Sequence, residues 1–308
     1  MTEFQEKLLQ TFKVFADFCK TNDLKYFAAY GTCLGAVRHH GFIPWDDDID
    51  VYMMRDDYER MLSLRDQLDG SIWKISDFRD GGYPYSFGKF YATDCSIWEL
   101  RQFPLIMGPW IDIFPIDEWI DDNEDASKLY NDVHYALWNY RKALSSQTWS
   151  EIWYDLIHLR GLNGPIKLVK KCFYSPLKRF YFKKAMTMVG KMKMLKGDMF
   201  KDWNDPQKKV YKKEWFNSIY ELPFEDTSIA CPIGYEDYLT YEFGDYMTPP
   251  PPEKRQGGHK CFYIDLKNKK SYKEILSEMK QRGALVDSEA KPLSIRVLID
   301  EILHRKGF

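Results

Sequence analysis

Apolar residues recur at every third or fourth position near the start of the chain. They are Phe4, Leu8, Phe12, Phe15 and Cys19. Thr2 and Gln5 precede this run with the spacing of a capping box, in which each side chain bonds the backbone of the other. The pattern therefore predicts an amphipathic helix that ends near Asn22.

Short apolar runs alternate with helical spacing over the next hundred residues. A strand is predicted over 25–30, a brief helix from the glycine turn at Gly31 to Arg38, and a second strand over 48–53. Helical spacing resumes over 56–68. Further short strands are predicted at 72–75, 87–92 and 110–114. These elements indicate an α+β core in which helices and strands surround one sheet.

From about residue 121 the pattern becomes mostly helical and basic. Residues 160–213 hold sixteen Lys and Arg against three Asp and Glu. We favour an ordinary solvated helical surface here, and keep a surface for anionic lipid headgroups or a polyanionic acceptor as the alternative. We predict no regular secondary structure over residues 221–260, where prolines 249–252 form a stiff extended run. The chain is accordingly divided into residues 1–120, 121–220 and 221–308.

Composition narrows the class of protein. The 308 residues are 44% hydrophobic and 29% charged, as in soluble globular proteins, and the net charge of −2 argues against nucleic-acid binding. The six cysteines are scattered without zinc spacing, which is typical of buried thiols in a reducing compartment. Neither a signal peptide nor a long apolar run is present. We expect a cytoplasmic protein, with peripheral contact at the inner face of the membrane if residues 160–213 bind lipid.

Four carboxylates crowd into five positions in the stretch PWDDDIDVYM, residues 44–53. On a strand, alternate side chains share a face, so Asp48 and Asp50 point one way while Ile49 and Val51 enter the core. Asp46 joins the same face if the extended geometry begins early. Like charges this close repel, and a folded chain that holds them needs something to offset the repulsion.

A second segment has the same design, because Asp112 lies between Ile111 and Ile113. A charge among apolar neighbours is unfavourable unless it has a partner. Two strands that each offer carboxylates predict a shared site for a hard divalent cation, Mg²⁺ or Mn²⁺, bound by Asp48, Asp50 and Asp112. The alternative is that the aspartates cap helices or form turns, which Asp46 and Asp47 could do by themselves.

A glycine turn precedes the acidic strand. Gly31 and Thr32 follow a predicted strand and open a helix, where exposed N–H groups and a hydroxyl can hold a phosphate. Most glycine turns before a helix bind no ligand. Ahead of a D-x-D strand, however, a phosphate held at this turn would face the predicted metal site. Arg38, near the end of the predicted helix, either contacts a phosphate or pairs with an aspartate.

Residues 30–50, YGTCLGAVRHHGFIPWDDDID, resemble the signature of the LicD family. This family comprises phosphocholine transferases of bacterial surface glycans and is related to the fukutin-type ribitol-phosphate transferases. The resemblance continues at residues 111–117, IDIFPID, and at 241–247, YEFGDYM, before the proline run and His259. The segment 121–220 matches no specific feature of the family.

The resemblance implies a nucleotidyltransferase-like fold of the polymerase-β type, with a mixed sheet and a mostly helical elaboration. Residues 1–120 would form the catalytic core and residues 221–308 would complete the active site. By family analogy, Gly31 and Thr32 hold phosphate while the three aspartates bind metal. Two departures are Thr32 in place of the commoner serine, and a single His259 where relatives often carry a histidine pair.

The implied reaction transfers a phospho-alcohol, such as phosphocholine, from a CDP-activated donor to a hydroxyl of a glycan acceptor, free or lipid-linked, and releases CMP. Two alternatives stay open. One is nucleotidyl transfer with release of pyrophosphate, and the other is a non-catalytic glycan-binding protein. The released product separates the first alternative, because phospho-alcohol transfer releases CMP and nucleotidyl transfer releases pyrophosphate. A non-catalytic protein is expected to have lost some of the three aspartates.

The family resemblance also points to further substrate-binding residues. Asp112 or Asp46 would act as general base toward the acceptor hydroxyl, unless Asp46 only holds a ligand in place. Lys89 is either a point charge for phosphate or a surface lysine. Arg255 and His259 lie in a loop that the resemblance places near the site, where His259 is either functional or an ordinary surface histidine.

Overall fold

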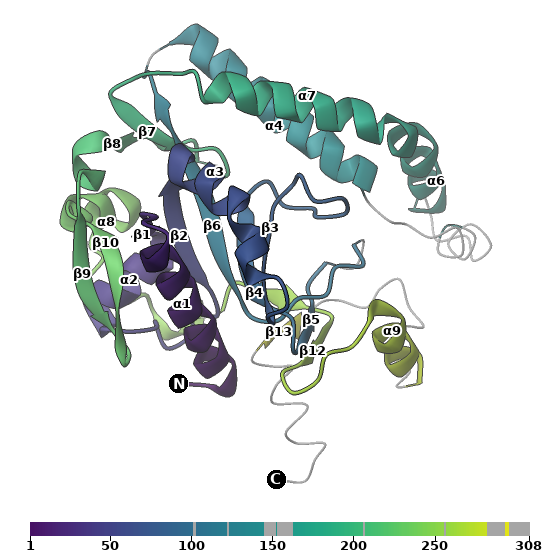
Figure 1. Ribbon diagram of the computed structural model, residues 1–308, viewed down its shortest axis with the longest axis horizontal. Coiled ribbons are helices and arrows are strands. Elements are labelled where there is room, and N and C mark those ends of the chain that lie inside the picture. The colour runs from purple at the N-terminus through teal and green to yellow at the C-terminus, as the bar shows by residue number, and fades with distance from the viewer. Residues whose placement is uncertain are drawn as a thin grey trace.

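The computed structural model describes residues 1–100, 103–121, 123–144, 152, 163–205, 207–255, 257–281 and 293–295. Within these ranges the chain forms one mixed sheet with helices packed against it and a helical arm beyond it (Figure 1).

The α-helices are α1 (Glu3–Thr21), α2 (Tyr30–His39), α3 (Arg55–Ser63), α4 (Glu124–Leu144), α6 (Asn163–Tyr174), α7 (Lys178–Met192), α8 (Tyr235–Phe243) and α9 (Tyr272–Gln281). Short 3₁₀ turns are η1 (Arg65–Leu68), η2 (Ser175–Leu177), η3 (Lys213–Phe216) and η4 (Pro252–Lys254). The strands are β1 (Phe27–Ala28), β2 (Ile49–Met54), β3 (Trp73–Ser76), β4 (Gly88–Ala92), β5 (Ser96–Trp98), β6 (Trp110–Trp119), β7 (Met199–Asp202), β8 (Tyr211–Lys212), β9 (Ile219–Phe224), β10 (Thr227–Pro232), β11 (Lys260–Cys261), β12 (Tyr263–Asp265) and β13 (Leu293–Ser294).

The main sheet is built around β6 and runs in the order β1-β2-β6-β4-β3. β2 lies parallel to β6, while β4 and β7 pair with it antiparallel. The first part of β6 contacts β2 and β4, and its last residues pair with β7, which carries β8. The predicted α+β class with a mixed sheet is confirmed.

The predicted amphipathic helix is also confirmed. Thr2 and Gln5 form the capping box, and the apolar positions of α1 are buried against β4 and β6. Ile49 and Val51 in β2 are fully buried, as the alternation in the sequence requires. Tyr52 and Met53 are fully buried too, so β2 enters the core on both faces beyond the acidic residues.

The helical arm consists of α4 and α7 side by side, with α6 at one end (Figure 1). It has its own apolar cluster, which includes Tyr130, Val133, Ala185, Val189 and Trp203. Residues 199–212 then return to the main sheet as β7 and β8. The segment 121–220 is therefore mostly helical but supplies two strands to the core.

Three local expectations were wrong. The strand predicted over 25–30 shrinks to β1, because Tyr30 already begins α2 with a positive φ of 44°. The helix predicted over 56–68 changes at Leu64 into the 3₁₀ turn η1. Residues 221–243 are not irregular, since β9 and β10 form a hairpin and α8 follows, whereas from Gly244 to β11 the described residues hold only the short turn η4.

Five cysteines are buried and carry free thiols, as expected, whereas Cys172 on α6 is exposed, which the sequence interpretation missed. Across the described ranges, none of the helices combines the length and the apolar character needed to span a membrane.

Candidate active site

The acidic residues meet where β2 and β6 run in parallel. Asp50 lies directly opposite Asp112 in the strand register, and Ile49 and Val51 flank it on the buried side. Asp48 precedes β2 by one residue. The hydroxyl of Thr32 accepts a hydrogen bond of 2.8 Å from the N–H of Asp50, so α2 is fixed to the start of this strand. The sheet thus places Asp50 beside Asp112, with Asp48 next to Ile49 along the chain. The ligand atoms that lie closest together in the described residues, however, are those of Asp47, Asp48 and His259.

Lys89 is a buried partner of Asp112 and not a surface lysine. It stands opposite Asp112 on β4, is 1% exposed, and its Nζ lies 2.5 Å from Asp112 Oδ1. Its ammonium also lies over the rings of Tyr85 and Trp110, at 4.5 and 4.3 Å from their centres. Lys89 therefore supplies one positive charge to the cluster from the neighbouring strand β4, and its ammonium packs against aromatic rings.

One lysine does not balance the cluster. Burial, followed by the charges of Asp48 and Asp112, raises the pKa of Asp50 well above its ordinary value. Burial and the neighbouring Asp48 likewise raise the pKa of Asp46 to about 9. A cation bound among these carboxylates would favour their ionised forms.

The loop at 257–259 closes over Asp47. The backbone N–H groups of Gly258 and His259 donate to Asp47 Oδ1 at 3.2 and 3.3 Å. His259 Nδ1 lies 3.2 Å from the same oxygen and 3.5 Å from Asp48 Oδ2. A Cβ on Gly257 would come within 2.3 Å of Asp47, so only glycine permits this approach. His259, predicted near the site, is therefore part of it.

Asp47, Asp48 and His259 form a compact set of metal-ligating residues, with one ligand atom from each within 4.8 Å of the others. Although burial lowers the pKa of His259, its hydrogen bond to Asp47 and the charge of Asp48 outweigh this and raise the pKa to about 9. In this protonated form the imidazole is a second internal cation and not a metal ligand; it can bind a metal only after losing its proton. Its ring stands edge-on to Trp110, which links it to the Lys89 environment.

Asp46 leads from this cluster into a large cleft. A Cβ on Gly31 would lie 2.8 Å from Asp46 Oδ2, so the carboxylate rests against the glycine backbone at the start of α2. Gln5 of α1 donates to the Asp46 carbonyl at 3.0 Å and fixes it there. The large cleft has a volume of about 640 Å³. It is lined by Tyr30, Gly31, Leu34, Ile43, Trp45, Asp46, Phe114, Asp202, Asn204, Asp205, Gln207, Lys209, Glu242, Phe243 and Gly258.

Of the two predicted arginines, Arg255 contacts Trp45, which lines the cleft, and Arg38 contacts the loop at Tyr246. The Arg255 guanidinium covers the Trp45 ring at 5.2 Å and donates to the Pro250 carbonyl. Arg38 donates to the Tyr246 carbonyl at 2.6 Å and forms no ion pair with an aspartate in the described ranges. Burial and the charge of Arg255 lower the pKa of Arg38, which shows that the two cations lie near each other.

The residue types fit a divalent metal. Hard carboxylate oxygens dominate the cluster, and the described part of the chain offers no cysteine or histidine set of the kind that zinc prefers. Asp50 and Asp112 are neighbours in the strand register, with Lys89 bonded to Asp112 and His259 close to Asp48. Asp117, at the other end of β6, instead pairs with the buried Arg55 at 2.6 and 2.9 Å and is structural.

Comparison with known proteins places this site in a family. The model described as LicD/FKTN/FKRP, nucleotidyltransferase domain, matches residues 23–192, more than half of the chain. The chain belongs to the LicD family. The resemblance found in the sequence is therefore confirmed, together with the assignment as a LicD-type enzyme.

Two relatives extend this result. The chain is 27% identical over 271 residues to the lipopolysaccharide cholinephosphotransferase LicD of Haemophilus influenzae, covering 84% of this chain and 96% of the relative. It is also 36% identical over 69 residues to an uncharacterized protein of Rickettsia prowazekii, covering 22% of this chain and 26% of that one. The first similarity includes nearly the whole relative, and the second is confined to one segment.

Some site residues escaped the sequence interpretation. Asp47 was taken for a turn residue, yet it holds the loop that carries His259. Asp202 lies in the basic segment and gave no local signal, because only the pairing of β7 with β6 brings it to the cleft. Besides the family resemblance, the Gly257-Gly258 pair was a visible sign of a close backbone approach next to His259.

The raised pKa of His259 has a consequence for stability. A folded-state pKa of about 9 against 6.5 in the unfolded chain means that protonated His259 stabilises the fold. This contribution is complete below pH 6.5 and is lost as the pH rises through 9. It amounts to at most about 3 kcal/mol.

We therefore expect the metal-free His259→Gln variant to be less stable than the parent at pH 6, with a difference that shrinks as the pH approaches 9.5. Urea unfolding of both proteins in a chelator, across this pH range, measures the difference. A difference that does not change with pH would contradict the assignment.

Proposed function

We propose that this protein transfers phosphocholine, or a closely similar phospho-alcohol, from a CDP-activated donor to a hydroxyl of a surface-glycan or lipid-linked oligosaccharide acceptor, and releases CMP. The observation that carries the proposal is the carboxylate cluster of β2 and β6, set at the edge of a large cleft in a LicD-family chain. The Haemophilus relative, which is named as a lipopolysaccharide cholinephosphotransferase, supports the choice of group and acceptor.

Asp48, Asp50 and Asp112 would hold the metal, with a nucleotidyltransferase-like fold of the polymerase-β type presenting them. When bound, Mg²⁺ or Mn²⁺ supplies positive charge at the diphosphate and at the leaving CMP. Lys89 keeps Asp112 oriented from the buried side, and His259 with Asp47 keeps Asp48 in place. Gly31 and Thr32 begin α2, whose N-terminal N–H groups would face the donor phosphates.

Asp46 is the better placed of the two candidate bases. It lines the large cleft, whereas Asp112 is 3% exposed and bound to Lys89. In the proposed step the acceptor oxygen attacks the phosphorus that carries choline, its proton passes to the Asp46 carboxylate, and the bond to the CMP oxygen breaks. Arg255, which covers Trp45 of the cleft, and Arg38 would attract the anionic donor or acceptor.

Loss of a metal-holding carboxylate tests this mechanism. Asp50→Asn keeps the shape of the side chain and removes its charge, so turnover should fall by about 10²- to 10³-fold, the range seen when one electrostatic contact of a transition state is removed. Release of CMP from CDP-choline in the presence of Mg²⁺ is the measurement.

The exposed Asp56→Asn on α3 is the matched control and should keep full activity. Near-normal turnover of Asp50→Asn would refute the mechanism, and release of pyrophosphate from a nucleoside triphosphate in place of CMP would favour nucleotidyl transfer.

The helical arm supplies a candidate membrane contact. Exposed apolar side chains follow one another along α6, η2 and α7, namely Ile166, Val169, Phe173, Leu177 and Phe180. The basic residues of 160–213 share this segment, and Phe173 is 69% exposed. Apolar and basic side chains together are typical of a helix that lies on an anionic membrane. We propose that the arm rests on the inner face of the membrane, where a lipid-linked acceptor would be found.

Co-sedimentation with vesicles tests this contact. The protein should bind vesicles that contain an anionic lipid, and the double variant Phe173→Ser, Phe180→Ser should bind them several-fold less, because apolar area that enters the lipid is lost. Activity on a water-soluble acceptor should not change. Equal binding of both proteins would exclude the arm as the contact.

A further inference from the structure

The large cleft carries more negative charge than positive. Its described lining includes four carboxylates, Asp46, Asp202, Asp205 and Glu242, against the single lysine Lys209. Lys209 is already paired, with its Nζ 2.8 Å from Glu242 Oε2. Asp46 belongs to the carboxylate cluster at one end of the cleft. The negative charge around Asp202, at the other end, has no such explanation.

Two aromatic rings and a buried carboxylate stand together at that end. The rings of Tyr30 and Phe114 are 5.9 Å apart and nearly perpendicular, at 88°. The Tyr30 hydroxyl donates to Asp202 Oδ2 at 2.7 Å, and Asp202 is fully buried. Among the described residues, no lysine or arginine forms an ion pair with Asp202. A carboxylate at the hydroxyl increases the electron density of the Tyr30 ring, and with it the attraction of the ring for a cation.

Burial raises the pKa of Asp202 to about 6, against the lowering effect of hydrogen bonds from Asn204 and Tyr30. The carboxylate is therefore ionised at pH 7.5. An ionised carboxylate in the interior without a cationic partner is unfavourable, and a cation in the cleft would relieve this.

The backbone of Tyr30 is held in an unusual conformation. Its φ of 44° lies in a region that tyrosine rarely occupies. The N–H of Tyr30 donates to the hydroxyl of Tyr238 on α8 at 2.8 Å. Strain of this kind concentrates where a side chain must be aimed at a ligand. Here it directs the ring of Tyr30 into the cleft while the neighbouring Gly31 stays beneath Asp46.

We propose that the large cleft contains the subsite for the quaternary ammonium of choline, bounded by the rings of Tyr30 and Phe114, with Asp202 as the counter-charge behind Tyr30. This inference rests on the proposed function and names the group that the enzyme carries. Asp202 acts through Tyr30 and is a positioning residue. The Tyr30 side chain runs from the backbone next to Gly31, which contacts Asp46, to Asp202. The aromatic corner is therefore set apart from Asp46, as the ammonium of phosphocholine is set apart from its phosphate by a two-carbon chain.

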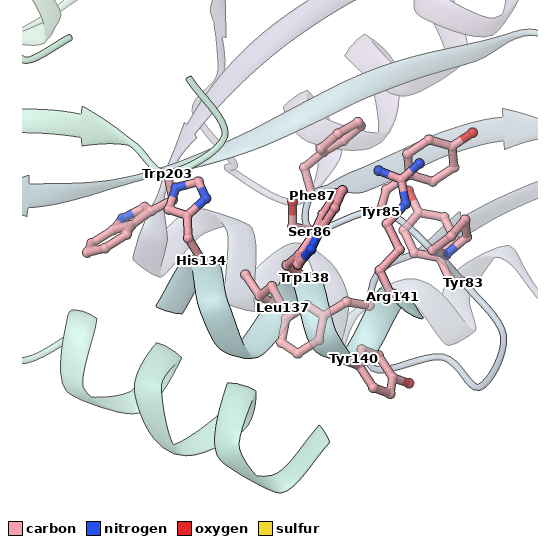
Figure 2. Close-up of a pocket in the computed structure, with 12 residues that line it drawn as sticks. Tyr83, Tyr85, Ser86, Phe87, His134, Leu137, Trp138, Tyr140, Arg141 and Trp203 are labelled. Atoms are coloured by element: carbon pink, nitrogen blue, oxygen red, sulfur yellow. The ribbon is translucent and has the colours of Figure 1, made fainter. Parts of the chain in front are cut away.

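A second aromatic cavity serves as the contrast. It has a volume of about 130 Å³ between the 83–87 loop and α4, and aromatic side chains form most of its wall (Figure 2). Arg141 projects into it beside Tyr85, and its described lining has no carboxylate. A positive charge without a counter-charge disfavours a cationic ligand there. Trp45 in the large cleft is unsuited for a different reason, since Arg255 already covers its ring.

A pair of ligands that differ only in charge tests the inference. Phosphocholine and 3,3-dimethylbutyl phosphate have the same shape, but a carbon replaces the nitrogen in the second. Calorimetric titration of each into the protein with Mg²⁺ gives an affinity ratio that does not depend on turnover. The parent protein should prefer phosphocholine by about tenfold.

Asp202→Asn retains the shape of the side chain and an acceptor oxygen for Asn204, while its NH2 group can donate to the Tyr30 hydroxyl. It should reduce the ratio to near one while leaving the affinity for 3,3-dimethylbutyl phosphate unchanged. Phe114→Leu, on a partly exposed ring, should also reduce the ratio, and it covers the case in which Asp202→Asn fails to fold. Trp138→Leu in the second cavity is the matched control and should keep the parent ratio.

If Asp202→Asn lost the same affinity for both ligands, the role of Asp202 would be purely structural and the inference would be overturned. The same holds if the parent protein shows no preference, or if only Trp138→Leu abolishes it. Release of CMP from another CDP-alcohol without a preference for phosphocholine would overturn this inference and leave the proposed reaction standing. The preference without any CMP release would support the subsite and refute the reaction.

Discussion

Electrostatic repulsion among carboxylates on two adjacent parallel strands is the constraint around which this molecule is organised. The strand register sets Asp50 against Asp112, and the turn before β2 adds Asp46, Asp47 and Asp48. Lys89 on the neighbouring strand β4 and His259 in the 257–259 loop offset part of this charge. The raised pKa values of Asp46 and Asp50 show that a deficit remains. In our account a divalent cation and the phosphates it attracts make up this deficit.

The rest of the fold brings distant segments to that point. α1 fixes the backbone of Asp46 through Gln5, and α2 fixes the strand through Thr32. The 257–259 loop contributes His259, and β7 contributes Asp202 after the helical arm. Each segment adds either charge or aromatic surface to the large cleft. At one end lies the carboxylate cluster, and at the other lie the rings of Tyr30 and Phe114 with the buried carboxylate of Asp202.

The sequence predicted the parts of the site that depend on local pattern. Alternation in β2 is enough to separate Asp50 from Ile49 and Val51, and the second acidic strand is visible from Asp112 between isoleucines. The family motif placed His259 near the site. Roles that depend on long-range pairing could not be recognised. Asp202 on β7 was not a candidate, and Lys89 was a candidate for phosphate, but its pairing with Asp112 depends on β4 lying beside β6. Likewise, Tyr30 has a positive φ and donates its N–H to Tyr238, a residue far along the chain, so local preference wrongly extended the preceding strand.

The most direct test of the central claim is a crystal structure of the protein with Mn²⁺ and a donor analogue, with anomalous diffraction recorded at the manganese edge. Our account predicts an anomalous peak between the carboxylates of Asp48, Asp50 and Asp112, at distances of about 2.0–2.3 Å from their oxygens. The absence of a peak there, with Lys89 as the sole partner of Asp112 and manganese bound elsewhere, would contradict the account.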